Sequence, residues 1–191
     1  WERKFLISIR SQVDDSERDL SPNQLAILVR IEEKNSPKRL QEIEEWLNEW
    51  DAERQEIARV VALYYQRELY FTNLASKILE SGYVPSAKEY QKICENKYAL
   101  KVREEHFKSP LYKVNSFVQV RKSISVNKHY IEENGGPIRI QNMFALVLET
   151  DALPVRRAAQ GAKVYKILPV GSARSYYVSE SDIKKAKKFN K

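Results

Sequence analysis

The chain has 191 residues, of which 42% are hydrophobic and 31% charged, and its formal net charge is +7. This composition supplies enough apolar side chains for a core and excludes a chain that is disordered throughout. No apolar run approaches the ~20 residues that a membrane span needs, so we expect no membrane association. Cys94 is the single cysteine. It cannot form an internal disulfide, which favours a cytoplasmic or other reducing intracellular compartment.

The positive charge is concentrated in the C-terminal part. Residues 1–110 hold 18 Lys and Arg against 20 Asp and Glu, a balance of −2, whereas residues 111–191 hold 15 against 6, a balance of +9. Such asymmetry favours contact between the C-terminal part and a polyanion. A basic surface kept for solubility is the alternative.

The N-terminal segment has the pattern of a helical hairpin. Apolar residues recur at three- and four-residue steps from Trp1 to Val13, which predicts a helix with one apolar face. Ser21 and Gln24 have the spacing of a capping box and predict the start of a second helix. Ser36-Pro37 is expected to end it.

A heptad stripe follows and predicts one long helix. Arg54 occupies the one polar position of a stripe with alternating three- and four-residue steps, formed by Leu40, Ile43, Leu47, Trp50, Ile57, Val61 and Tyr64. We interpret it as a bundle or stalk helix. Homodimerisation along the stripe is the alternative, and Arg54 counts against it.

Residues 71–93 repeat the pattern of the first hairpin at a constant offset of 65. Ser21 then corresponds to Ser86 and Gln24 to Glu89, which gives a second capping box. An internal duplication or chance similarity between amphipathic helices explains the match. The sequence thus predicts a helical module over residues 1–108, with two helix-loop-helix hairpins flanking the long helix.

The pattern changes to short strands after Ser109-Pro110. Apolar runs near residues 114–120, 143–148, 162–170 and 175–178 predict strands, and Gly135-Gly136-Pro137 and Gly171-Ser172 predict turns. Ser181-Asp182-Ile183 is expected to form a helical turn that leads into a lysine-rich tail. The predicted fold class is α+β, with a basic small β-barrel domain over residues 112–191.

Catalytic and metal-binding patterns are weak. His106, His129 and Cys94 lack the spacing of a zinc site, and no nucleotide-binding, hydrolase or metalloprotease motif occurs. Glu149, Asp151 and Lys163 are the only group that suggests a metal-dependent nuclease. We therefore expect a protein that is not an enzyme and has no cofactor or metal.

Nucleic-acid-binding chemistry is better represented. The loop over residues 154–163 combines three cations with small residues that allow close approach, so Arg156, Arg157 and Lys163 are the first candidates for phosphate contacts. The secondary electrostatic candidates are Arg174, Lys184, Lys185, Lys187 and Lys188. An ordinary exposed β-loop is the alternative, and the aromatic residues between these cations, Tyr165 above all, are also typical of a core.

The four strand-like runs of residues 112–183 resemble SH3-like barrels of the KOW/Tudor type. They read Phe117-Val118-Gln119-Val120-Arg121, Ala145-Leu146-Val147-Leu148-Glu149, Val164-Tyr165-Lys166-Ile167-Leu168 and Ser175-Tyr176-Tyr177-Val178. The resemblance implies a short helical turn before a last strand, for which the sequence after residue 183 shows no clear pattern. SH3-like barrels bind RNA, DNA, peptides or no ligand. The helical hairpins resemble small modules of phage-type DNA-metabolism proteins.

Together these features predict a non-enzymatic nucleic-acid-binding accessory protein of DNA or RNA metabolism. The basic domain would contact phosphates, while the helical module would contact a protein partner or position the basic domain. The alternative is a protein-interaction or structural adaptor of a larger assembly, in which the basic surface meets acidic protein.

Overall fold

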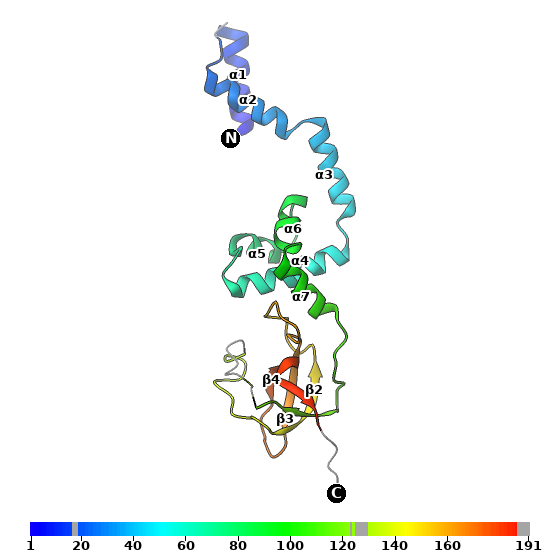
Figure 1. Ribbon diagram of the computed structural model, residues 1–191. Helices are drawn as coiled ribbons and strands as arrows, with labels where there is room; N and C mark the ends of the chain where they lie inside the picture. Colours follow the sequence, from blue (N-terminus) through cyan, green and yellow to red (C-terminus); the bar gives the residue numbers. More distant parts are fainter. Residues whose placement is uncertain (17–18, 123, 125–129, 187–191) are drawn as a thin grey trace. The chain divides into compact units, whose positions relative to one another are not determined.

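The structure is a computed structural model that describes residues 1–16, 19–122, 124 and 130–186 (Figure 1). It confirms the α+β class, because helices precede an antiparallel sheet. The helices are α1 (Glu2–Ser16), α2 (Pro22–Lys34), α3 (Pro37–Glu49), α4 (Ala52–Glu68), α5 (Thr72–Leu79), α6 (Ala87–Cys94) and α7 (Lys97–Phe107). The strands are β1 (Phe117–Val120), β2 (Phe144–Thr150), β3 (Val164–Pro169), β4 (Tyr176–Ser179) and β5 (Ile183–Lys185), and the 3-10 helix η1 (Glu180–Asp182) precedes β5.

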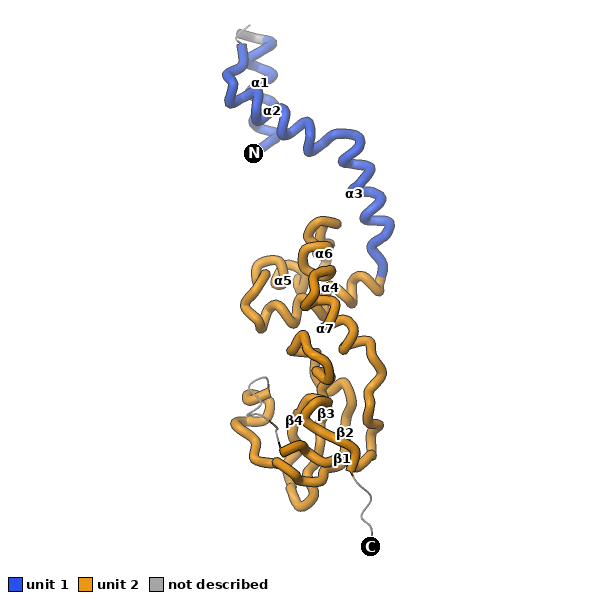
Figure 2. The backbone as a smooth tube through the Cα atoms, in the orientation of Figure 1, with its two compact units in different colours: residues 1–51 blue, residues 52–191 orange. Residues whose placement is uncertain are grey.

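The chain forms two compact units, which Figure 2 colours separately. Unit 1 is Trp1–Asp51 and unit 2 is Ala52–Lys191. The sequence-based boundary between residues 108 and 112 lies inside unit 2. Unit 1 has 8 Lys and Arg against 12 Asp and Glu, a balance of −4, and unit 2 has 25 against 14, a balance of +11. The charge asymmetry therefore follows the division into units.

Unit 1 consists of α1, α2 and α3, and its helix starts agree with the sequence. The Gln24 amide donates to Ser21 Oγ over 3.3 Å, and the Ser21 amide donates to Gln24 Oε1 over 2.9 Å, so the first capping box is confirmed. Ser36 caps α3 by accepting from the Arg39 amide, and Pro37 occupies the first turn. Ser36-Pro37 thus starts a helix as well as ending one.

The predicted long helix over residues 40–64 is wrong, because α3 ends at Glu49 and α4 begins at Ala52. Trp50 has extended backbone angles of φ −74° and ψ 94°, which interrupt the helical hydrogen bonds. No Gly or Pro marks this break. The only local signal is Asp51 directly before α4, since Asp favours the N-cap position.

In unit 2, α4 is the central helix, and α5, α6 and α7 all pack against it. Its buried side chains are Ile57, Ala58, Val60, Val61, Ala62, Tyr64 and Tyr65. Ser86 and Glu89 form the second predicted capping box at the start of α6. With 8 residues each, α5 and α6 are shorter than α1 and α2, which have 15 and 13. None of the helices that the structure describes is long and apolar enough to cross a membrane.

The sheet has the strand order β4-β3-β2-β1-β5, with every pair antiparallel. The four predicted strands are confirmed, and the predicted helical turn is η1. A fifth strand, β5, follows it and pairs with β1 through Gln119–Lys184 and Val120–Ile183. The closed barrel is not confirmed, because β4 and β5 are the two edges of an open sheet.

The core of the sheet explains which side chains of β1 reach solvent. Val118 and Val120 are fully buried in a cluster that includes Val147, Ile167 and Ile183. Alternation along a strand turns the intervening residues outward, and Phe117 is 59% exposed. The segment between β1 and β2 also contributes buried side chains, among them Tyr130, Ile138 and Ile140.

Candidate nucleic-acid interface

Arg156 is a buried structural residue. Its side chain is 6% exposed, its guanidinium donates to Glu133, and it lies over the Tyr130 ring with 5.2 Å from Cζ to the ring centroid. The hydrogen bond from Arg156 lowers the pKa of Glu133 from 4.5 to about 2. The guanidinium is therefore committed to an internal ion pair and does not face a phosphate.

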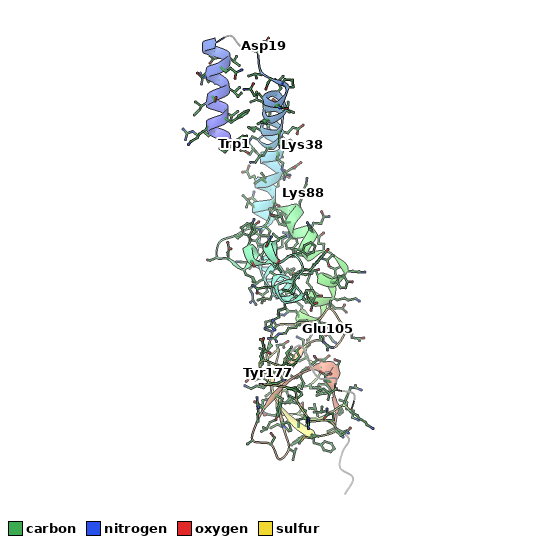
Figure 3. All side chains as sticks on the ribbon, turned by 90° about the vertical axis from the view of Figure 1, so that its left-hand side faces the viewer. Trp1, Asp19, Lys38, Lys88, Glu105 and Tyr177 are labelled. Atoms are coloured by element: carbon green, nitrogen blue, oxygen red, sulfur yellow. The ribbon has the colours of Figure 1, made fainter. Side chains whose placement is uncertain are left out.

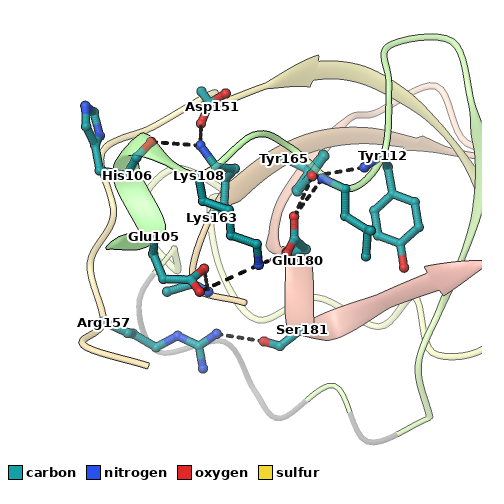
Figure 4. Close-up of polar contacts among 12 residues, drawn as sticks. Glu105, His106, Lys108, Tyr112, Asp151, Arg157, Lys163, Tyr165, Glu180 and Ser181 are labelled. Carbon is teal, nitrogen blue, oxygen red and sulfur yellow. Dashed lines mark hydrogen bonds and ion pairs between the residues drawn. The ribbon is translucent and has the colours of Figure 1, made fainter. Parts of the chain in front are cut away.

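Lys163 is also enclosed, with a side chain that is 2% exposed. Its Nζ donates to the His106 carbonyl over 3.0 Å and pairs with Asp151 (Figure 4). These contacts join the end of α7 to the residue directly before β3. Asp151 pairs with Lys163, and Glu149 pairs with Lys166 at 3.1 Å, so both acids of the nuclease alternative are engaged in ion pairs.

Arg157 and Arg174 are more accessible but make internal hydrogen bonds. Arg157 is half-buried and donates to Ser181 Oγ over 2.9 Å. Arg174 is exposed, donates to the Asn134 carbonyl and lies over the Tyr176 ring at 5.6 Å. Gly161, with φ +70°, lies against Ser181, whose backbone nitrogen would be 3.0 Å from an added Cβ. The small residues of this loop thus allow a close contact within the protein, between Gly161 and Ser181.

Lys184 and Lys185 lie on β5, an edge strand, where Lys184 is half-buried and Lys185 exposed. Lys184 lies opposite Gln119 in the β1–β5 ladder. Lys187 and Lys188 fall outside the described residues. Among the cations that the sequence predicts as phosphate contacts, the secondary candidates therefore include the most accessible ones.

An open pocket of about 400 Å³ lies beside Lys185 and is lined by Leu111, Tyr112, Ser116, Phe117 and Lys185. Leu111 is 66% exposed and Phe117 is 59% exposed, so apolar surface and a cation lie together. Exposed Lys113 lies in the sequence between the lining residues Tyr112 and Ser116, and Arg121 directly follows β1, where its Nε donates to the Ile183 carbonyl over 3.1 Å. We call Leu111, Tyr112, Lys113, Phe117, Arg121, Lys184 and Lys185 the β1–β5 surface.

The cations of the β1–β5 surface differ from the buried ones because no carboxylate of the described residues pairs with them. Within the described residues, Lys113, Arg121, Lys184 and Lys185 take part in no ion pair. Four of the six acidic residues in 111–191 pair with other cations: Glu133, Glu149, Asp151 and Glu180. Arg157 and Arg174 likewise have no carboxylate partner within the described residues, so cations without ion pairs lie both at this edge of the sheet and near the loop of residues 154–163.

A buried carboxylate holds the segment that carries the pocket. Glu180 accepts hydrogen bonds from the Tyr165 hydroxyl at 2.7 Å, the Leu111 amide at 3.1 Å and Lys108 Nζ at 3.3 Å. Burial raises the pKa of Glu180, but these donors outweigh it and leave the pKa below its ordinary value. The Tyr165 hydroxyl also accepts from the Tyr112 amide over 3.2 Å. Figure 4 shows this network between the α7 end, β3 and η1.

Tyr165 has the core role expected from the sequence, since it is fully buried. Cys94 is buried as well, and burial raises the pKa of its thiol to about 12, which is unfavourable for a nucleophile. No group of three or more metal-ligating side chains occurs in the described part of the chain.

Sequence reasoning missed Leu111 and Phe117 as surface residues. The apolar run predicts a strand at Phe117 but not its exposure, which strict alternation with Val118 and Val120 indicates. Leu111 carries no such signal, because its position depends on the bond to Glu180, 69 residues away.

The chain matches no protein-family model, and neither the curated proteins nor the solved structures provide a significant match.

Proposed function

We propose that unit 2 binds single-stranded nucleic acid through the β1–β5 surface, without catalysing a reaction, as an accessory protein of DNA or RNA metabolism. The observation that carries the proposal is the pocket in which the exposed Phe117 ring lies beside Lys185, a cation with no carboxylate partner within the described residues, while Lys113, Arg121 and Lys184 lie on the neighbouring segments. Lysine and arginine neutralise phosphates, and an exposed ring stacks on an unpaired base.

The pocket favours single strands over duplex. Bases inside a duplex are stacked on each other, whereas an unpaired base is free to lie on Phe117 while Lys185 contacts the adjacent phosphate. The lining of the pocket is mostly aliphatic and aromatic, with one serine and one lysine. It therefore has few side chains that could hydrogen-bond to the edges of the bases. We therefore expect little sequence preference.

The resemblance to SH3-like barrels fits this proposal. The resemblance is supported by the short helical turn η1 directly before β5 and by the pairing of β5 with β1. In such an arrangement, the β1–β5 surface would be one side of a small barrel domain.

The proposal is tested by removing two of the unpaired cations. Lys184→Gln with Lys185→Gln should weaken binding of a fluorescent oligonucleotide roughly tenfold near 0.1 M salt and reduce the slope of log K against log [salt] by about 1.4. Fluorescence anisotropy against single-stranded DNA, RNA and duplex DNA at several salt concentrations measures both quantities. The matched control is Lys88→Gln with Lys101→Gln, which removes the same charge from exposed positions on α6 and α7.

A second variant separates stacking from charge. Phe117→Ala should weaken binding of single strands by roughly 5- to 100-fold, the usual range for one lost stacking contact, and leave the salt slope unchanged. The β1–β5 surface is not the site if Lys184→Gln with Lys185→Gln binds as tightly as the parent. The same conclusion follows if this variant loses no more affinity than the control Lys88→Gln with Lys101→Gln. Absence of binding by the parent at low salt would favour the adaptor function.

A further inference from the structure

Unit 1 has very little core of its own. Among its described residues only Ile9 and Ile31 are buried hydrophobic side chains, at 7% and 8% exposure. Large apolar side chains of this unit remain exposed on all three helices and directly before α1, namely Trp1, Leu6, Ile7, Val13, Leu25, Val29, Leu40, Ile43 and Leu47. A chain segment of about 50 residues with so little burial requires a partner for stability.

Helix α3 is the clearest case, because it is amphipathic and none of its residues is buried. Leu40, Ile43, Leu47 and the following Trp50 occupy alternating three- and four-residue steps, and Leu40 and Leu47 are each 52% exposed. Figure 1 shows α3 extending away from the α1–α2 hairpin, and Figure 3 shows side chains projecting around the helices of this unit. A 13-residue helix is marginal in water on its own.

We infer that α3 pairs in parallel with α3 of a second copy of this chain, through the stripe of Leu40, Ile43, Leu47 and Trp50. In heptad terms Leu40, Ile43 and Leu47 are a, d and a, and the C-cap residue Trp50 directly after the helix stands at the next d spacing, which makes the stripe self-complementary. Arg54, which counted against a dimer in the sequence, lies on α4 and not on this helix. The polar break in the stripe is thereby removed.

Charge supports a second copy in parallel orientation. Arg39 then occupies a g position and Glu44 the following e position, so each Arg39 faces Glu44 of the other copy. Within one chain, Arg39 pairs with Glu42 at 2.8 Å. An antiparallel pair would instead place the two Glu44 side chains against each other. The net charge of −4 on unit 1 also disfavours a polyanion as the occupant.

The first test removes the apolar stripe in the full chain. Sedimentation velocity over a wide concentration range should show the parent passing from one to two copies, whereas Leu40→Asp with Leu47→Asp should weaken association at least a hundredfold. The control is Leu100→Asp with Val170→Asp, since these apolar residues of unit 2 are 49% and 59% exposed. A parent that stays monomeric, or a stripe variant that dimerises like the parent, would overturn the inference.

A charge exchange tests the orientation and leaves the stripe intact. Arg39→Glu alone and Glu44→Arg alone should each weaken the dimer several-fold, because each creates like-charge contacts across the interface. Combining them restores opposite charges, so the double variant should dimerise nearly as well as the parent. If the double variant is weaker than both single variants, the parallel register is wrong.

Discussion

Arg156 illustrates how burial changes the role of a basic residue. In the sequence it lies in a loop with Arg157 and Lys163, a cluster typical of phosphate binding. In the structure its guanidinium is enclosed by Glu133 and Tyr130, so its charge is paired inside the protein. A buried ion pair costs desolvation energy when it forms, and removing one partner leaves the other buried and unpaired.

Arg156→Ala should therefore lower the free energy of unfolding by about 2–4 kcal/mol at pH 7, with little change in nucleic-acid affinity per folded molecule. Glu133 has a lowered pKa, so the pair stabilises the fold above the ordinary pKa of 4.5, and this stabilisation is lost as the pH falls toward 2. Urea unfolding at several pH values should show the parent and the variant converging in that range. The control is Arg139→Ala at an exposed position, which should cost less than about 0.5 kcal/mol. A difference between parent and Arg156→Ala that is constant from pH 7 to pH 2 would exclude this ion pair as its source.

At the scale of elements, buried polar contacts hold α7 against the sheet region. Glu105 is 4% exposed and accepts a hydrogen bond from the amide of fully buried Ala162 over 3.1 Å. Lys163 and Glu180 connect the same two regions. These contacts place α7 and the sheet in one unit, although the sequence pattern changes sharply between them.

Glu105→Ala should leave the Ala162 amide without its acceptor, lower the free energy of unfolding by about 1–3 kcal/mol and speed hydrogen exchange at Ala162. Glu105→Gln keeps an acceptor oxygen and should cost less. The control is Glu104→Ala, because Glu104 is exposed on the same helix. Amide exchange followed by NMR measures the effect directly. Unchanged exchange at Ala162 in Glu105→Ala would show that this bond does not hold the junction.

At the scale of the whole molecule, the two units differ in charge and in burial. Unit 1 is acidic and poorly buried, and unit 2 is basic and contains most of the core. This division fits a role in protein contact for unit 1 and a role in nucleic-acid binding for unit 2. Dimerisation would join two β1–β5 surfaces in one particle and raise the apparent affinity for long strands.

The division also predicts two unfolding transitions. All three tryptophans lie in unit 1 and all eleven tyrosines in unit 2, so their fluorescence reports on the units separately. Tryptophan emission should change at lower urea than tyrosine emission, and only the tryptophan midpoint should shift with protein concentration. Coincident transitions that are independent of concentration would show instead that both units unfold as one cooperative structure.

The local features of this protein follow from its sequence alone, because they depend on neighbouring residues. The capping boxes at Ser21 and Ser86 and the alternation of β1 follow from three- and two-residue spacings. Which cations face solvent depends instead on how the chain folds. Arg156 is buried against Glu133 and Lys163 against the His106 carbonyl, and these partners lie 23 and 57 residues away in the sequence. Burial depends on such distant contacts, which composition and periodicity do not contain.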